Sequence, residues 1–263
     1  MTELNFTYDA TLAFSGEVWD QQYVLRCLPV RDAAQTVLAQ SLSVTPGPPP
    51  FLGVDGFGNT VVTGSILAPH SSFACHSAGL VRVCRPQNLA GGYTPALRYP
   101  GALTKPDTAL QAFFASLPGP GAMPSPYAWC AQLSRAVSDH FTYLPGVTGV
   151  NTTAAAAFRQ QSGVCQDYAQ VFLTLARLAG YPARYCMGLA VGEGATHAWA
   201  EVCLPGIGWQ GFDPTRGCTA GEEYLLFGTG RDAADCPAER GVLRGNVGQT
   251  QTVFMRCEQE KSQ

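Results

Sequence analysis

The 263-residue chain carries little charge, since only 13% of its residues are charged and the net charge is -3. Without a basic field, we do not expect a nucleic-acid polyanion as the main partner, and an acidic membrane surface is disfavoured for the same reason. No apolar run reaches the roughly 18 residues of a membrane span, and the N-terminus lacks the pattern of a secretory signal. Taking Met1 as the native start, the sequence predicts a soluble, cytoplasmic protein without a membrane segment.

Metal-ligand spacings are also missing from the sequence. The 10 cysteines contain no C-x-x-C pair, the 4 histidines are never three or four residues apart, and no D-x-[DN]-x-[DN]-G calcium loop occurs. Cys75-His76 with Cys84 comes nearest to a cluster, but adjacent ligands rarely share one tetrahedral site. We therefore expect no metal and no other cofactor. Reduced thiols are favoured over disulfides because the chain is long and shows no export signal.

Apolar residues are plentiful, at 46%, and in the first third of the chain they alternate with polar ones as in β-strands. Turn-forming sequences such as PGPPP separate the alternating segments, which are 4–14, 22–30, 36–44, 59–67 and 73–83. A Pro- and Gly-rich connector follows. We predict an N-terminal antiparallel β-domain over residues 1–95 and a second domain over 96–263.

The second domain shows helical spacing before it shows strands. Apolar residues recur at helical intervals in four segments: 109–117, 128–141, a stretch capped by Thr152 or Thr153, and a stretch from Cys165 to Gly180. Short strands are then expected at 183–191, 197–204 and 208–215, with 224–227 and 250–255 as edge or return strands. The order of these elements is typical of an α+β protein.

The stretch QSGVCQDYAQ places Cys165 at the start of the fourth helix. A thiol attacks a carbonyl carbon as its thiolate, and the free amides and dipole of a helix N-terminus favour an anion there. Gly163 lets the chain turn sharply, and the amide of Gln166 would point toward an oxyanion on the attacked carbonyl. These features predict a nucleophilic cysteine, with a small buried thiol as the alternative.

A thiolate nucleophile needs a base that can return its proton to a leaving amine, which is a task suited to imidazole. His197 opens a strand directly after the small-residue stretch GEGAT, and Asp213 ends the next strand. A hairpin through the turn at 205–208 would let Asp213 fix the tautomer of the imidazole. The two residues lie at unequal depths from the turn, so a bulge or a diagonal pairing must bring them together. From spacing alone, a structural histidine is the alternative.

Three stretches together resemble the bacterial transglutaminase-like family, a branch of the papain-like cysteine enzymes: SGVCQDYAQVFLTLARLAGYPARY, THAWAEVCLPGIGWQGFDPTRG and GRDAADCPAERGVLRG. The N-terminal segments LRCLPV and DGFGN are similar to the β-domain that accompanies many bacterial members. The resemblance implies a core in which the nucleophile helix packs on an antiparallel sheet. It also implies roles for three residues: Cys165 as nucleophile, His197 as general base and acid, and Asp213 as the residue that orients the imidazole.

Two positions depart from the family pattern and bear on substrate preference. Gln170 stands where many relatives have histidine, and Ala233 where many have an aromatic residue. Among other neighbours, we expect Trp199 and Trp209 in the core or a cleft wall, and Asp167 as a first-turn carboxylate that complements the helix dipole. Arg231 and Asp232 are expected to form a local ion pair.

The implied activity is that of a cysteine hydrolase, a protease or amidase that cleaves a peptide or protein substrate through a thioester. Hydrolysis is favoured over amine transfer because no calcium-site motif is found. The alternatives are a protein-glutamine amine acyltransferase (a transglutaminase), a thiol acyltransferase with a small acyl donor, and a non-catalytic binding module that retains the fold. The sequence leaves the oligomeric state open.

Overall fold

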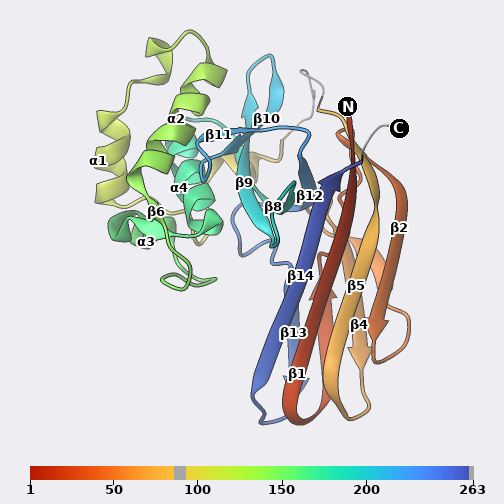
Figure 1. The fold of residues 1–263 in the computed structure, drawn as a ribbon. Helices are drawn as coiled ribbons and strands as arrows, with labels where there is room; N and C mark the ends of the chain where they lie inside the picture. The colour runs from red at the N-terminus through yellow and green to blue at the C-terminus, as the bar shows by residue number, and fades with distance from the viewer. Residues whose placement is uncertain (86–92, 261–263) are drawn as a thin grey trace.

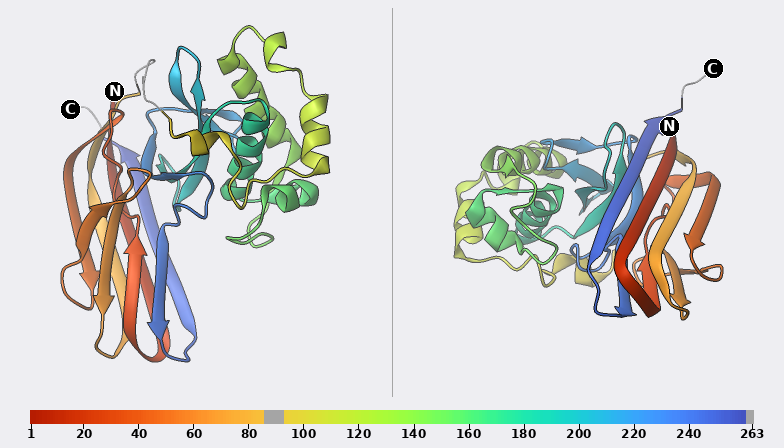
Figure 2. Two further views of the ribbon diagram at one scale, coloured as in Figure 1. Left: turned by 180° about the vertical axis from the view of Figure 1, so that it is seen from behind. Right: turned by 60° about the horizontal axis from the view of Figure 1, so that its bottom comes forward.

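The structure is a computed structural model that describes residues 1–85 and 93–260 of the chain. Long strands form a β-sandwich at one end of the molecule, helices gather at the other end, and a shorter sheet lies between them (Figures 1 and 2). The predicted α+β class is therefore confirmed, with an N-terminal antiparallel β-region followed by a core of helices on an antiparallel sheet.

The sandwich is organised by its first strand, which doubles back on itself near its middle (Figure 1). Its strands are β1 (Thr2–Leu25), β2 (Gln35–Thr45), β3 (Phe51–Val54), β4 (Thr60–Ile66), β5 (His70–Val83), β13 (Glu239–Arg244) and β14 (Gln249–Gln259). The first half of β1 pairs antiparallel with β5 and β14, and its second half pairs with β4 and β13. The expected strand at 4–14 lies in the first half of β1, and the expected strand at 22–30 lies in its second half only up to Leu25, because residues 26–30 form no strand.

The last two strands belong to the sandwich although they follow the whole core in sequence. Leu4 of β1 pairs with Gln259 of β14, and Phe14 pairs with Gln249. The predicted boundary at residue 95 divides the chain by position in the sequence. Strand pairing, in contrast, places β13 and β14, within residues 239–259, in the same sandwich as β1. Alternating hydrophobicity marks a strand, but it does not say which sheet the strand will join.

One continuous apolar core joins the sandwich to the central sheet. Leu4, Phe6 and Tyr8 alternate toward the interior of the sandwich and are buried. The ring of Phe6 meets the ring of Phe227 edge-on, with centroids 5.5 Å apart. Phe227 lies in the central sheet, so the two halves of the molecule pack directly on each other.

The central sheet has the strand order β11-β10-β9-β8-β12. Its strands are β8 (Ala183–Ala190), β9 (His197–Leu204), β10 (Gly208–Asp213), β11 (Cys218–Ala220) and β12 (Tyr224–Gly230). The helices are α1 (Thr108–Ser116), α2 (Pro126–His140), α3 (Ala154–Gln160) and α4 (Cys165–Leu178). The short elements are η1 (Pro95–Arg98), η2 (Pro120–Ala122), β6 (Thr142–Tyr143) and β7 (Ser162–Gly163).

Local sequence sets the ends of the helices that carry the site. The Thr153 hydroxyl caps α3 by accepting the Ala156 amide at 3.2 Å, as one of the two expected caps. α4 begins at Cys165 and ends before Gly180, whose φ of 86° is the left-handed conformation that glycine adopts freely. α4 packs across β9 and β8 (Figure 1). Its N-terminus is thereby brought to the sheet that bears the histidine.

Within the described part of the chain, no helix combines the length and the apolar character that crossing a membrane requires.

Candidate active site

The β9–β10 hairpin brings His197 and Asp213 together without a bulge. Glu201 pairs with Gly211 and Ala200 with Phe212, so continuing this register sets Asp213 opposite Trp199. His197 is two residues from Trp199 on the same face, and Asp213 is therefore its diagonal neighbour. His197 Nε2 lies 2.8 Å from Asp213 Oδ2. Of the two pairings that the unequal depths allowed, the diagonal one is found.

Cys165 stands at the first position of α4, next to the imidazole of His197. The turn before it is held by Asp167, whose Oδ2 accepts the Val164 amide at 2.8 Å. A Cβ at position 163 would meet that same oxygen at 2.3 Å, so only glycine fits this close approach. Gly163 and Asp167 together fix where the thiol emerges from the helix.

His197 and Asp213 are both buried, and their pKa values move in opposite directions. Burial lowers the pKa of His197, but hydrogen bonds with Asp213 and Cys165 outweigh it and raise this pKa from 6.5 to about 9. Burial raises the pKa of Asp213, yet its hydrogen bond and charge interaction with His197 lower it overall. At neutral pH the pair is therefore an imidazolium and a carboxylate. Because Nε2 is engaged by Asp213, Nδ1 is the ring nitrogen left to exchange a proton with the thiol.

Asp213 is held by more partners than sequence reasoning identified. Its Oδ2 also accepts the Tyr224 hydroxyl at 2.8 Å, and its Oδ1 accepts the backbone amide of Thr215 at 2.9 Å. Burial and the charge of Asp213 raise the pKa of Tyr224 far above its usual range, so this phenol remains a donor. Tyr224 was expected only as part of an edge strand, which β12 is, because no local pattern links it to a residue three strands away in the sheet.

The two expected tryptophans lie where the sequence predicted. Trp199 is fully buried between His197 and Tyr224, and its ring meets that of Tyr224 edge-on at 5.3 Å. Trp209 lies under the guanidinium of Arg184, whose carbon is 4.4 Å from the ring centroid. Both side chains therefore serve packing around the hairpin that carries the histidine.

Four other residues refine or correct the expectations. Asp167 lies in the first turn of α4 as predicted, but it is fully buried and burial raises its pKa, so it acts as a capping group that holds the turn. Gln170 is buried too and donates to the Thr152 carbonyl at 3.1 Å. The expected Arg231–Asp232 pair is wrong. Arg231 pairs instead with Asp235, at position i+4, at 2.8 Å. Asp232 accepts a hydrogen bond from the backbone amide of Leu103.

Within residues 1–85 and 93–260, no group of three or more His, Cys, Asp or Glu side chains is arranged to hold a metal ion. The side chain of Gln166, the residue after the thiol, is directed at the carbonyls of Gly149 and Val150 at 3.5 and 3.4 Å. The phenol of Tyr143 is largely exposed. Partial desolvation is the main cause that raises the pKa of Tyr143, and the nearby Cys165 is the second. Only Tyr143 of these two side chains is free to turn toward a substrate.

A cysteine at the start of a helix, packed on an antiparallel sheet that bears a histidine–aspartate pair, defines the class of the transglutaminase-like core fold. The model of the transglutaminase-like superfamily matches residues 121–214, and the model of the bacterial transglutaminase-like N-terminal region matches residues 4–82. The chain belongs to this family. Cys165, His197 and Asp213 all lie within the matched core.

The chain is similar in sequence to two uncharacterized mycobacterial proteins and similar in fold to a solved structure. The chain is 27% identical to an uncharacterized protein of Mycobacterium leprae, over 84% of this chain and 85% of the relative. It is 28% identical to an uncharacterized protein of Mycobacterium tuberculosis, over 83% of this chain and 80% of the relative. The crystal structure of a candidate cysteine protease from Cytophaga hutchinsonii has the same fold, with a TM-score of 0.80 at 20% identity, over 100% of this chain and 92% of the other.

The reactivity of the ten thiols provides a direct check of the site. Cys84 and Cys218 are exposed, whereas Cys165 is half-buried. Exposure alone therefore predicts that iodoacetamide modifies Cys84 and Cys218 first. We expect the reverse order in native protein at pH 6.5, because a helix N-terminus and a neighbouring imidazolium are features that increase the reactivity of a cysteine. Peptide mapping by mass spectrometry gives the order of labelling. Preferential labelling of Cys165 should disappear in urea, and Cys165 lagging behind Cys84 in the native protein would contradict the activation.

Proposed function

We propose that this protein is a cysteine hydrolase of peptide or amide bonds, with Cys165 as nucleophile, His197 as general acid and base, and Asp213 as the residue that orients the imidazole. The observation that supports it is the buried His197–Asp213 hydrogen bond of 2.8 Å beside a thiol at a helix N-terminus. The description of the Cytophaga protein as a candidate cysteine protease agrees with this proposal. A peptide or protein substrate is part of the proposal, and a cytoplasmic location stays a prediction from sequence.

In the first half of the reaction, the Cys165 thiolate forms a bond to the carbonyl carbon of the substrate. The resulting oxyanion is proposed to be stabilised by the Gln166 amide at the start of α4. The C–N bond then breaks, and the leaving amine takes its proton from the His197 imidazolium through Nδ1. An amine departs and a thioester on Cys165 remains.

In the second half, neutral His197 removes a proton from water as the water oxygen attacks the thioester carbonyl. The C–S bond breaks, so the product leaves as a carboxylic acid and the sulfur returns to its thiolate form beside a protonated imidazole. Asp213 keeps a proton on Nε2 throughout, because a carboxylate can only accept a hydrogen bond. Its role is to hold one tautomer and to stabilise the imidazolium.

Product analysis tests the proposed function. Wild-type protein and Cys165→Ala are incubated with a peptide library, with and without a primary amine, and the products are followed by mass. We expect water-derived carboxylic acids that are lost in the variant. Amine adducts that replace these acids would identify a transferase, and identical product patterns from the two proteins would remove Cys165 from the reaction.

The pH profile of the hydrolysis should be limited on its alkaline side by His197. Because hydrogen bonds with Asp213 and Cys165 raise the pKa of His197 to about 9, the imidazolium persists through neutral pH and is lost as the pH rises through that value. We expect kcat/KM, which reports the free enzyme, to fall above about pH 9. A decline already centred near the usual histidine pKa of about 6.5 would contradict the tight pairing.

A further inference from the structure

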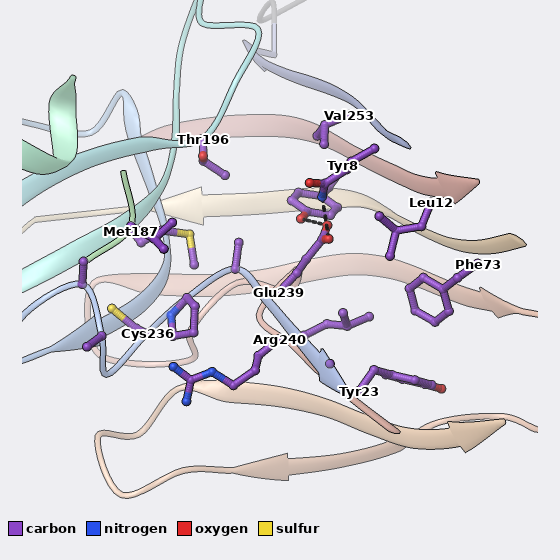
Figure 3. Close-up of a pocket in the computed structure, with 18 of the residues that line it drawn as sticks. Tyr8, Leu12, Tyr23, Phe73, Met187, Thr196, Cys236, Glu239, Arg240 and Val253 are labelled. Carbon is purple, nitrogen blue, oxygen red and sulfur yellow. Dashed lines mark hydrogen bonds between the residues drawn. The ribbon is translucent and has the colours of Figure 1, made fainter. Parts of the chain in front are cut away.

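A cavity of about 640 Å³ begins beside the candidate active site and extends into the β-sandwich (Figure 3). Cys165 and His197 do not themselves line it, but their chain neighbours Gln166 and Thr196 do. At its far end the walls are formed by β1, β13 and β14. The cavity is within the range of about 300–1,000 Å³ that ligand sites occupy. A molecule bound next to the thiol could therefore continue between the two layers of the sandwich.

Apolar and polar side chains both line the cavity, and one acidic group lies between the layers. Leu12, Phe73, Met187 and Val253 provide apolar surface (Figure 3). Glu239, half-buried on β13, is the single carboxylate among the residues that line the cavity in the described chain. A cavity that combines apolar surface with placed polar groups can both bind and orient a ligand.

Glu239 is held in place by two donors. Its Oε1 accepts the hydroxyl of Tyr8 at 2.5 Å, and its Oε2 accepts the side-chain amide of Gln251 at 2.7 Å. Figure 3 shows Glu239 directed toward the Tyr8 ring. Burial and the neighbouring charge of Glu239 raise the pKa of Tyr8 far above its usual range, which keeps the phenol a donor. Among the described residues, no Lys, Arg or His nitrogen lies within 4.0 Å of this carboxylate.

The neighbouring arginine does not supply the missing positive charge. Arg240 follows Glu239 on β13, and successive side chains of a strand point to opposite faces. In Figure 3 the two side chains diverge, with the guanidinium directed away from Tyr8. Arg240 is also exposed, so it lies at the rim of the cavity while Glu239 lies between the layers.

We propose that this cavity binds the substrate of the site through an apolar segment that carries a cationic group, an ammonium or a guanidinium, which pairs with Glu239. This inference rests on the proposed function, since the ligand of the cavity is the substrate that Cys165 attacks. A group that a carboxylate holds as a cation has no free lone pair and cannot attack the thioester. Glu239 is therefore a specificity residue, and the cationic group belongs to the recognised part of the substrate.

Binding is measured with Cys165→Ala, which cannot turn the ligand over. The probes are acetylated tetrapeptide amides, Ala-Leu-Xaa-Ala, in which Xaa is lysine, glutamine or glutamate, and calorimetry gives their dissociation constants. We expect the lysine peptide to bind about tenfold more tightly than the glutamine peptide, the size typical of a hydrogen bond to a charged group. The glutamate peptide should bind most weakly.

The variant Glu239→Gln, made in the same background, removes the charge but keeps an amide that can bond to Tyr8 and Gln251. It should remove the preference for lysine without lowering the melting temperature. Glu258→Gln makes the same change on β14, at an exposed position that does not line the cavity, and should leave the preference intact. Equal binding of lysine and glutamine peptides, no binding of any peptide, or a lysine preference that survives Glu239→Gln would each overturn the proposal.

The same peptides separate this inference from the proposed function. Selective binding of the lysine peptide, without cleavage by wild-type protein, would leave the cationic site standing and count against hydrolysis. Cleavage of all three peptides at equal kcat/KM would support hydrolysis and count against the cationic site. Tighter binding of the glutamate peptide would move recognition to Arg240 and contradict the role of Glu239.

Discussion

Replacement of Cys165 by alanine is expected to lower the rate of peptide hydrolysis by about 10⁵- to 10⁶-fold, the loss typical of removing a nucleophile. The thiol provides the only protein atom that bonds to the substrate in the proposed mechanism, so nothing in the remaining site can form the thioester. The fold should be unaffected because Cys165 is half-buried and the turn before it is held by Asp167. Steady-state kinetics on a cleaved library peptide, with thermal melting as a check of folding, measure the effect.

The matched control for this variant is Cys84→Ala. Cys84 is an exposed thiol that directly follows β5 and, in the described part of the chain, makes no hydrogen bond with Cys165, His197 or Asp213, so its loss should change neither kcat nor KM. Comparable residual activity in the two variants would show that another group performs the chemistry.

Replacement of Asp213 by asparagine should reduce kcat by about 10⁴-fold while the protein remains folded. An asparagine amide can donate to Nε2 of His197, which would move the ring proton to Nδ1, the nitrogen that must accept the proton of the thiol. The variant also removes the hydrogen bond and the charge that raise the pKa of His197. We therefore expect the alkaline limb of kcat/KM to move to lower pH, a shift that a purely structural defect would not produce.

Tyr224→Phe tests how much the hydrogen bond from Tyr224 to Asp213 contributes to activity when Asp213 can still orient the imidazole of His197. It removes one donor to Oδ2 and leaves the Thr215 amide and His197 in place. The cost of one hydrogen bond is about 0.5–1.5 kcal/mol, so kcat should fall by about tenfold at most. If Asp213→Asn were as mild as Tyr224→Phe, the carboxylate would have no special role in fixing the tautomer.

The candidate site was largely predictable because its parts are encoded locally. A glycine before Cys165 and an apolar helix after it indicate a helix start, and the turn at 205–208 joins the strands that carry His197 and Asp213. Even the unequal depths of these two residues pointed to the diagonal contact that the hairpin register produces. Local patterns of this kind need no knowledge of the rest of the chain.

Contacts between distant segments could not be predicted in the same way. Tyr224 reaches Asp213 from a strand at the other end of the central sheet, and Glu239 meets Tyr8 across 231 residues. The Arg231–Asp232 expectation failed for a related reason, because adjacent charges diverge and Arg231 turns to Asp235. Such choices depend on tertiary packing, which periodicity does not encode.

The return of β14 to the first half of β1 has a consequence for how the molecule is made. While a ribosome is still synthesising the helices and the central sheet, one side of the emerging β1 has no partner, because its neighbour β14 follows these elements in the sequence. An unpaired strand edge is prone to associate with other chains, and contacts between distant segments form slowly. Newly made copies are therefore expected to aggregate most readily before β14 has been translated.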